Sequence, residues 1–149
     1  MNKTDIKYNG GGVYAIINNA DRKIYIGQSS NIAKRLEKHK SAMKNGKHIY
    51  NELNDGFQAG KIHFRILRKE NIHDRRLLLE KIYIYTALNK GLNLYNHSNE
   101  MKSRKQLQEY IVYWLLQIEK TETDLKEILY DVSGYNTING YKYGKYIKD

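Results

Sequence analysis

The sequence predicts a mixed α/β fold, and three observations indicate it. First, β-branched and aromatic residues concentrate at 12–18 and 23–27, on either side of a turn cluster, which is typical of a hairpin. Second, a similar run at 62–67 predicts a third strand. Third, residues 31–44 and 73–89 carry apolar side chains at helical spacing. A length of 149 residues suits one domain, or one domain with a small appendage.

The first two strands predict a hairpin that brings two tyrosines together. Its turn cluster reads Asn-Asn-Ala-Asp at 18–21. If the hairpin turns about Asn19 and Ala20, Tyr14 pairs directly across from Tyr25 and both rings lie on one face of the sheet. A slip of one residue in the register would separate the two rings.

The helix predicted at 31–44 follows a glycine and is strongly basic. Gly27 ends the second strand, and the serine and asparagine side chains after it are N-cap candidates. Arg35 and His39 are four residues apart, so they share a face of this helix. Asn45 and the glycine after it end the helix.

The remaining elements divide the chain into two parts. A short helix is predicted at 49–58, and the later helix at 73–89 is closed by Asn-Lys-Gly. Polar residues at 98–104 predict a connector. We therefore predict a first domain at 1–97 and a helical C-terminal extension at 98–149.

The extension has the pattern of a helix-turn-helix DNA-binding element. An apolar stripe at 107–118 predicts one helix, and residues 122–130 predict a second. The helix-turn-helix pattern consists of the helix at 123–129, a turn at 132–133 and the segment Asn-Thr-Ile-Asn at 136–139, with residues near 134–142 expected in the major groove. Residues 132–148 carry three lysines and no acid, so Lys142 and Lys145 are candidates for phosphate contacts. The alternatives for this extension are a small helical cap or a dimer arm, and the oligomeric state stays open.

The charge of the chain favours a polyanionic partner for the first domain. The net charge is +10, and residues 1–97 hold 18 Lys/Arg against 8 Asp/Glu, whereas the extension holds 8 of each. A basic surface favours nucleic acid through counterion release. We therefore expect DNA as the partner, with Lys34 and Lys38 on the basic helix among the contacts. The alternative is that the charge serves solubility alone.

Features absent from the sequence narrow the class further. The chain has no cysteine, which excludes a disulfide framework and a thiolate zinc site. No apolar run approaches the roughly 20 residues of a membrane span, and no secretory signal is visible at the N-terminus. We therefore expect a cytoplasmic protein without membrane contacts.

Several side chains have the chemistry that phosphodiester cleavage requires. A tyrosine such as Tyr14 or Tyr25 can orient or deprotonate a water, and an arginine such as Arg35 can hold phosphate charge. His39 and His48 can shuttle protons near neutral pH. Each has a structural alternative when taken singly, because the chain holds 14 tyrosines that can pack in the core, and charged or histidine side chains often lie on the surface.

Glu80 is the strongest local anomaly in the sequence. It shares a helical face with Leu77 and Ile84, where an acid is costly unless it is paired or bound to a metal. Either Arg76, four residues earlier, is its partner, or the carboxylate holds a hard, oxygen-ligated ion such as Mg²⁺.

Taken together, these motifs resemble those of the GIY-YIG endonuclease family. Gly-Val-Tyr at 12–14 and Tyr-Ile-Gly at 25–27 match the two motifs in the family's name, with Val13 in place of isoleucine. The resemblance covers roughly 10–97, and its spacing is similar to that of phage intron homing endonucleases. The matched positions are Tyr14, Tyr25, Arg35, His39, His48, Glu80 and Asn93.

The resemblance implies a small three-stranded antiparallel sheet flanked by helices, and metal-dependent hydrolysis of DNA. On that template Glu80 binds Mg²⁺ or Mn²⁺, and Arg35 stabilises charge on the scissile phosphate. Tyr14 or Tyr25 orients or activates the attacking water, with His39 as a proton relay. The supporting residues are His48 and Asn93.

We therefore predict a stand-alone DNA endonuclease of a phage or mobile element. One alternative is a structure-specific repair nuclease, which would prefer flapped or branched DNA. The other is a non-catalytic protein that keeps the fold and binds DNA without cutting it.

Overall fold

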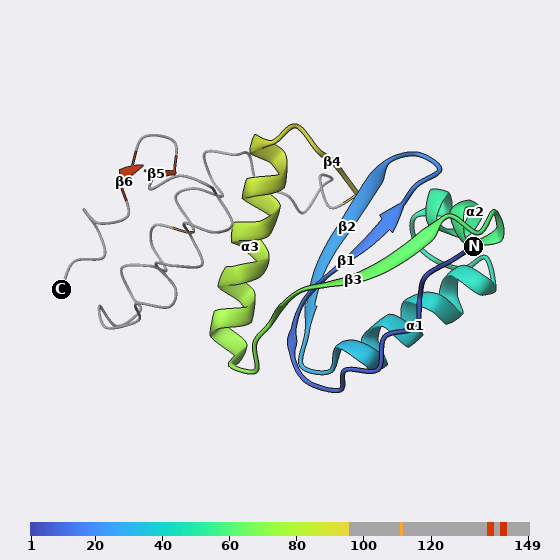
Figure 1. The fold of residues 1–149 in the computed structure, drawn as a ribbon, viewed down its shortest axis with the longest axis horizontal. Coiled ribbons are helices and arrows are strands. Elements are labelled where there is room, and N and C mark those ends of the chain that lie inside the picture. Colours follow the sequence, from blue (N-terminus) through green and yellow to red (C-terminus); the bar gives the residue numbers. More distant parts are fainter. Residues whose placement is uncertain (96–110, 112–136, 139–140, 143–149) are drawn as a thin grey trace.

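The computed structural model shows a twisted sheet with helices on both faces (Figure 1). The residues that the structure describes are 1–95, 111, 137–138 and 141–142. Within them, no helix combines the length and apolar character that crossing a membrane requires.

Four strands form the sheet, in the order β3–β1–β2–β4. Their bounds are β1 Gly12–Asn18, β2 Lys23–Ser29, β3 Ile62–Lys69 and β4 Asn93–Leu94. β1 pairs antiparallel with β2, as the sequence predicts, and it also pairs antiparallel with β3, in line with the antiparallel sheet that the resemblance implies. β4 is an addition to the expected three strands, and it pairs parallel with the edge of β2. It was not predicted because two residues are too few to show the alternation of a strand.

The hairpin between β1 and β2 differs from the predicted register. Tyr14 lies opposite Gly27, and Tyr25 lies opposite Ile16, so the direct pairing of the two tyrosines was wrong. The turn is longer than expected because the last strand pair is Asn18 with Lys23. Since a shift of two residues keeps side chains on the same face, both rings still share a face, with centroids 6.2 Å apart.

Side-chain hydrogen bonds within the turn explain its length. The Asn18 carboxamide accepts the amide of Ala20, and the Asp21 carboxylate accepts the amide of Lys23. Arg22 adopts a positive φ of 60°, the left-handed conformation that closes the loop. These polar residues therefore hold a four-residue loop where a two-residue turn was expected.

Three helices cover the sheet. Their bounds are α1 Ile32–Lys44, α2 Asn51–Gln58 and α3 His73–Asn89. Figure 1 shows α3 on one side of the sheet and α1 with α2 on the other. The alternation along β1 explains this arrangement, because Tyr14 and Ile16 pack with Leu36 of α1, whereas Val13 packs with Leu79 of α3.

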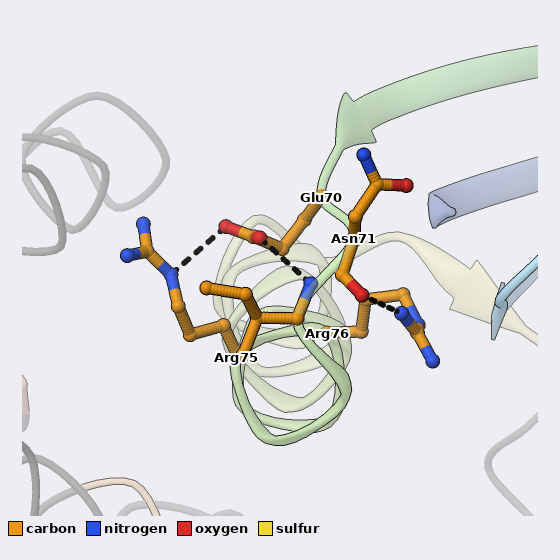
Figure 2. Close-up of polar contacts among 5 residues, drawn as sticks. Glu70, Asn71, Arg75 and Arg76 are labelled. Atoms are coloured by element: carbon orange, nitrogen blue, oxygen red, sulfur yellow. Dashed lines mark hydrogen bonds and ion pairs between the residues drawn. The ribbon is translucent and has the colours of Figure 1, made fainter. Parts of the chain in front are cut away.

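The connection from β3 to α3 is held by charged and amide side chains (Figure 2). The Glu70 carboxylate pairs with Arg75 at 2.9 Å and accepts the amide of Ile72 at 3.0 Å. Arg76 donates to the Asn71 carbonyl at 2.6 Å, as Figure 2 shows. It also donates to the side chain of Gln28 at the end of β2, at 3.1 Å. The first turn of α3 is thereby tied to the strand that carries Tyr25.

Few residues of the extension fall within the described part of the chain. Ile111 is buried and packs in the same core cluster as α3. Thr137–Ile138 (β5) and Tyr141–Lys142 (β6) pair as antiparallel strands. The predicted helix-turn-helix otherwise lies outside the described residues, as does the candidate Lys145.

Candidate active site

Four of the predicted site residues form one aromatic cluster. Tyr14 comes from β1, Tyr25 from β2, His39 from α1 and His48 from the segment before α2. The His39 ring lies 5.7 Å from Tyr14, 5.4 Å from Tyr25 and 5.1 Å from His48, measured between centroids. Residues spread along the first third of the chain therefore meet at one place on the sheet.

Hydrogen bonds join three of these residues in a row. The Tyr14 hydroxyl and His39 Nε2 are 2.9 Å apart, and His39 Nδ1 and His48 Nε2 are 2.8 Å apart. All three side chains are buried, and the Tyr14 side chain is only 1% exposed. A row of this kind can orient a proton or stabilise charge in a site that excludes water.

Burial shifts the pKa values in the cluster so that the neutral forms of the tyrosines and His39 are favoured. It raises the pKa of both Tyr14 and Tyr25, and Glu80 adds a smaller increase to each; Tyr25 also raises the pKa of Tyr14. Burial also lowers the pKa of His39 to about 3, assisted by His48 and Arg35. At neutral pH His39 is therefore neutral, and charge on either tyrosine oxygen requires nearby cations.

Arg35 supplies such a cation beside both tyrosines. It lies on α1, one turn before His39, and its side chain is exposed. A hydrogen bond to Tyr14 raises the pKa of Arg35, with a smaller contribution from Tyr25. The guanidinium is thus held at the edge of the cluster, where it can also meet a phosphate.

A cleft of about 220 Å³ opens beside the cluster. Tyr25, rather than Tyr14, lines it. The cationic residues of its lining are Arg35, Lys38 and Lys47. Lys34 and Lys38 are both exposed on α1, so the cleft and the surface near it are positively charged. A cavity of about 370 Å³ beneath α3 is lined mainly by apolar residues and contains none of the predicted site residues.

Glu80 comes from α3 and acts on the same cluster through its charge. It contributes to the raised pKa values of Tyr14 and Tyr25. Its own pKa is raised by burial and lowered by Lys81, whose ammonium is 3.5 Å from the carboxylate. The alternative that Arg76 is the partner of Glu80 was wrong, because Arg76 bonds to Gln28 and the Asn71 carbonyl.

Asn93 lies apart from the aromatic cluster. It is exposed in β4, at the edge of the sheet, and pairs there with Lys23.

The neighbouring Tyr95 reaches the cluster through Tyr50, with ring centroids 5.2 Å apart. Sequence reasoning missed Tyr50, Tyr95 and Asn54, a buried residue of α2 that holds the backbone of His48. The only signal for Tyr95 in the sequence was its position two residues after Asn93, which matches the family.

Comparison with known proteins identifies the family of the chain. The sequence profile of the GIY-YIG catalytic domain matches residues 10–96. Among solved structures, a mutant of the catalytic domain of intron endonuclease I-TevI is similar, with 24% sequence identity and a TM-score of 0.49. That match covers 62% of this chain and 98% of the other. No curated protein sequence matches significantly. Because the profile spans more than half of the chain and includes every residue of the cluster, the chain belongs to the GIY-YIG family and is a DNA endonuclease.

Proposed function

We propose that the protein hydrolyses DNA phosphodiester bonds with the help of a divalent metal ion, as a stand-alone nuclease of a phage or mobile element. The observation that carries this proposal is the convergence of two tyrosines, two histidines and an exposed arginine beside a cationic cleft. The half-buried carboxylate of Glu80 lies close enough to raise the pKa values of both tyrosines.

The side chains divide the chemistry among them. Arg35 binds the scissile phosphate and stabilises the charge that builds on its oxygens. Tyr25 and Tyr14 orient or activate the attacking water, and Tyr25 is the one that lines the cleft. His39 adjusts the protonation of Tyr14 through their hydrogen bond. Lys34 and Lys38 hold the flanking backbone of the DNA.

Glu80 is the residue that would hold Mg²⁺ or Mn²⁺. Within the described residues, no group of three His, Cys, Asp or Glu side chains is suited to hold a metal. A single carboxylate fits a hard ion whose other ligands are water and phosphate oxygens. The raised pKa of Glu80 fits as well, since a half-buried carboxylate is stabilised by a cation. A bound ion would neutralise phosphate charge and make a water more acidic.

Cleavage of plasmid and linear duplex DNA with and without Mg²⁺ tests the proposal. Glu80→Ala and Arg35→Ala should lose cleavage while they retain DNA binding. Glu37→Ala, which removes an exposed carboxylate of α1, should cut like the wild type. A folded wild-type protein that leaves every DNA substrate intact in Mg²⁺ and Mn²⁺ would contradict the proposal.

The mobile-element role requires a separate test. A stand-alone nuclease of this type should prefer particular duplex sequences over flaps and branches. A panel of linear, flapped and branched duplexes of shared sequence measures that preference. Strong preference for the flapped or branched substrates would instead indicate a structure-specific repair nuclease.

A further inference from the structure

Asn54 holds the backbone of His48 with both ends of its side chain. The His48 amide donates to Asn54 Oδ1 at 3.0 Å, and Asn54 Nδ2 donates to the His48 carbonyl at 3.2 Å. Asn54 lies on α2 and is 7% exposed, so neither bond is open to solvent. The two bonds fix the position of the segment that carries the His48 ring.

The next backbone amide determines which ring nitrogen of His48 carries the proton. The Tyr50 amide lies 3.2 Å from His48 Nδ1. A backbone amide can only donate, so Nδ1 must accept. Neutral His48 therefore carries its proton on Nε2.

That tautomer sets the direction of every following hydrogen bond. His48 Nε2 donates to His39 Nδ1, at 2.8 Å. His39 then carries its own proton on Nε2 and donates to the Tyr14 hydroxyl oxygen, at 2.9 Å. The reverse direction would place a His48 Nδ1 proton against the Tyr50 amide proton, and two facing donors would both be left without an acceptor.

The Tyr14 oxygen thus accepts a hydrogen bond from His39, and Arg35 acts on the same residue by lowering the pKa of Tyr14. With His39 Nε2 already protonated, this histidine does not take the proton of Tyr14. Its role is to stabilise negative charge on the tyrosine oxygen when that proton leaves toward the cleft. Contact with Tyr14 also lowers the pKa of Tyr25, the tyrosine that lines the cleft, against the larger effect of burial.

We propose that Asn54 is a positioning residue for DNA cleavage: by holding the His48 backbone, it fixes a one-way hydrogen-bond chain from the Tyr50 amide through His48 and His39 to Tyr14. This inference rests on the proposed function. Asn54 itself does not line the cleft, and it hydrogen bonds to the backbone of His48, which does.

The first test is the tautomeric state of both histidines in the wild-type protein. Side-chain ¹⁵N chemical shifts at neutral pH distinguish a proton on Nδ1 from one on Nε2. We expect His39 and His48 both to carry the proton on Nε2. A proton on Nδ1 of either ring would overturn the direction of the chain and with it the proposal.

The second test removes both bonds of Asn54 without adding charge. Asn54→Leu should slow single-turnover cleavage about tenfold or more and leave DNA affinity within about twofold of the wild type. The His48 spectrum should show mixed tautomers. Asn51→Leu is the matched control, because Asn51 is exposed on the same helix. If Asn54→Leu does not fold, Asn54→Asp keeps the acceptor for the His48 amide and loses only the donor to its carbonyl, and it should show the same changes more weakly.

Slower cleavage with unchanged tautomers would mean that Asn54 only supports the fold, and unchanged cleavage would mean that the chain is not used. Either result overturns the proposal. Failure of the proposed function looks different, because then the wild-type protein itself would not cut DNA, whatever its tautomers.

Discussion

At the scale of single residues, the site depends on how closely its rings approach the backbone. The Tyr14 ring lies against Gly27, where a Cβ atom would come within 2.6 Å of the phenol oxygen. The same atom would be 3.0 Å from the Tyr25 ring. Position 27 therefore requires a glycine, because the Tyr14 ring occupies the space that a larger side chain at this position would need.

Gly27→Ala should push the Tyr14 hydroxyl away from His39. Because displacement of a catalytic group by about 1 Å can cost about a hundredfold in rate, we expect cleavage to fall by about that factor. Single-turnover rates measure it, with DNA binding measured alongside. Ser30→Ala, an exposed change just beyond β2, serves as the control. A wild-type rate for Gly27→Ala would show that the ring has room to move.

Acid should destabilise the protein through His39. Its folded pKa is about 3, below the ordinary value of 6.5. The unfolded chain therefore binds a proton that the folded chain rejects, and stability is lost as pH falls from 6.5 toward 3. Lowering the pH from 7 to 5 should cost about 2 kcal/mol from this residue. Urea unfolding at both pH values measures the loss, which should be smaller in His39→Gln. Equal losses in both proteins would contradict this origin.

The sequence predicts the residues of the candidate site better than the residues that hold them in position. Tyr14, Arg35 and His39 were predictable because each has a chemical reason to stand beside a phosphate. Asn54 was not, because its value depends on a tertiary contact with the backbone of His48, six residues earlier. Spacing alone gives no sign of such a contact.

At the scale of elements, the start of α3 determines where Glu80 points. Ile72 at the N-cap has no side-chain acceptor to offer, so Glu70 accepts its amide instead. The Asn71 side chain accepts the amide of Gly11, the residue just before β1, at 2.8 Å. Arg76, four residues before Glu80, joins this group to the end of β2. The rotation of the helix about its axis is therefore fixed by polar bonds to two strands.

Arg76→Leu should loosen that attachment. Arg76 is 5% exposed, and its loss leaves the Gln28 side chain and the Asn71 carbonyl without their donor, at a cost of about 2 kcal/mol or more. If Glu80 holds Mg²⁺ as proposed, a less firmly attached α3 should also make cleavage need more Mg²⁺ to reach half of its maximal rate. Denaturant unfolding and a Mg²⁺ titration measure both effects. Arg68→Ala, an exposed arginine of β3, is the control. An unchanged Mg²⁺ requirement would separate Arg76 from the placement of Glu80.

The helices and the longer strands were largely predictable from the sequence, but the register of the hairpin between β1 and β2 was not. Residues 73–89 were predicted as a helix from their apolar spacing and the glycine that follows, and Gly91 does adopt a positive φ of 75°. The register of β1 with β2 was wrong because Asn18 and Asp21 make turn contacts that depend on side-chain geometry. β4 depends on the rest of the sheet and has too little sequence of its own.

At the scale of the whole molecule, the extension contributes at least one residue to the core of the nuclease domain. Ile111 is fully buried among residues of α3, including Leu79 and Ile82. The hypothesis that the extension recognises DNA must therefore be separated from a role in packing.

Two variants make that separation. Ile111→Ala should destabilise the protein by about 2–5 kcal/mol, because it leaves a cavity beside α3. Below its unfolding temperature it should keep the wild-type site preference. Truncation after residue 97 should lose the same stability and also blunt site preference, if the extension reads DNA. Thermal unfolding and cleavage-site mapping compare the two. Equal site preference in all three proteins would leave the extension with packing alone.

The bond between Tyr95 and Asp21 has a consequence for the order in which the protein is made. The Tyr95 hydroxyl donates to Asp21 at 2.5 Å, and the Asn18 side chain donates to the same hydroxyl. The turn of the hairpin that carries Tyr14 and Tyr25 is thus bonded to a residue that is translated 74 residues after Asp21. Glu80 also leaves the ribosome long after both tyrosines. Until those residues emerge, a nascent chain holds the tyrosines without the Glu80 carboxylate and without β4, so if Glu80 acts as proposed, the nuclease should stay inert until the domain is nearly complete.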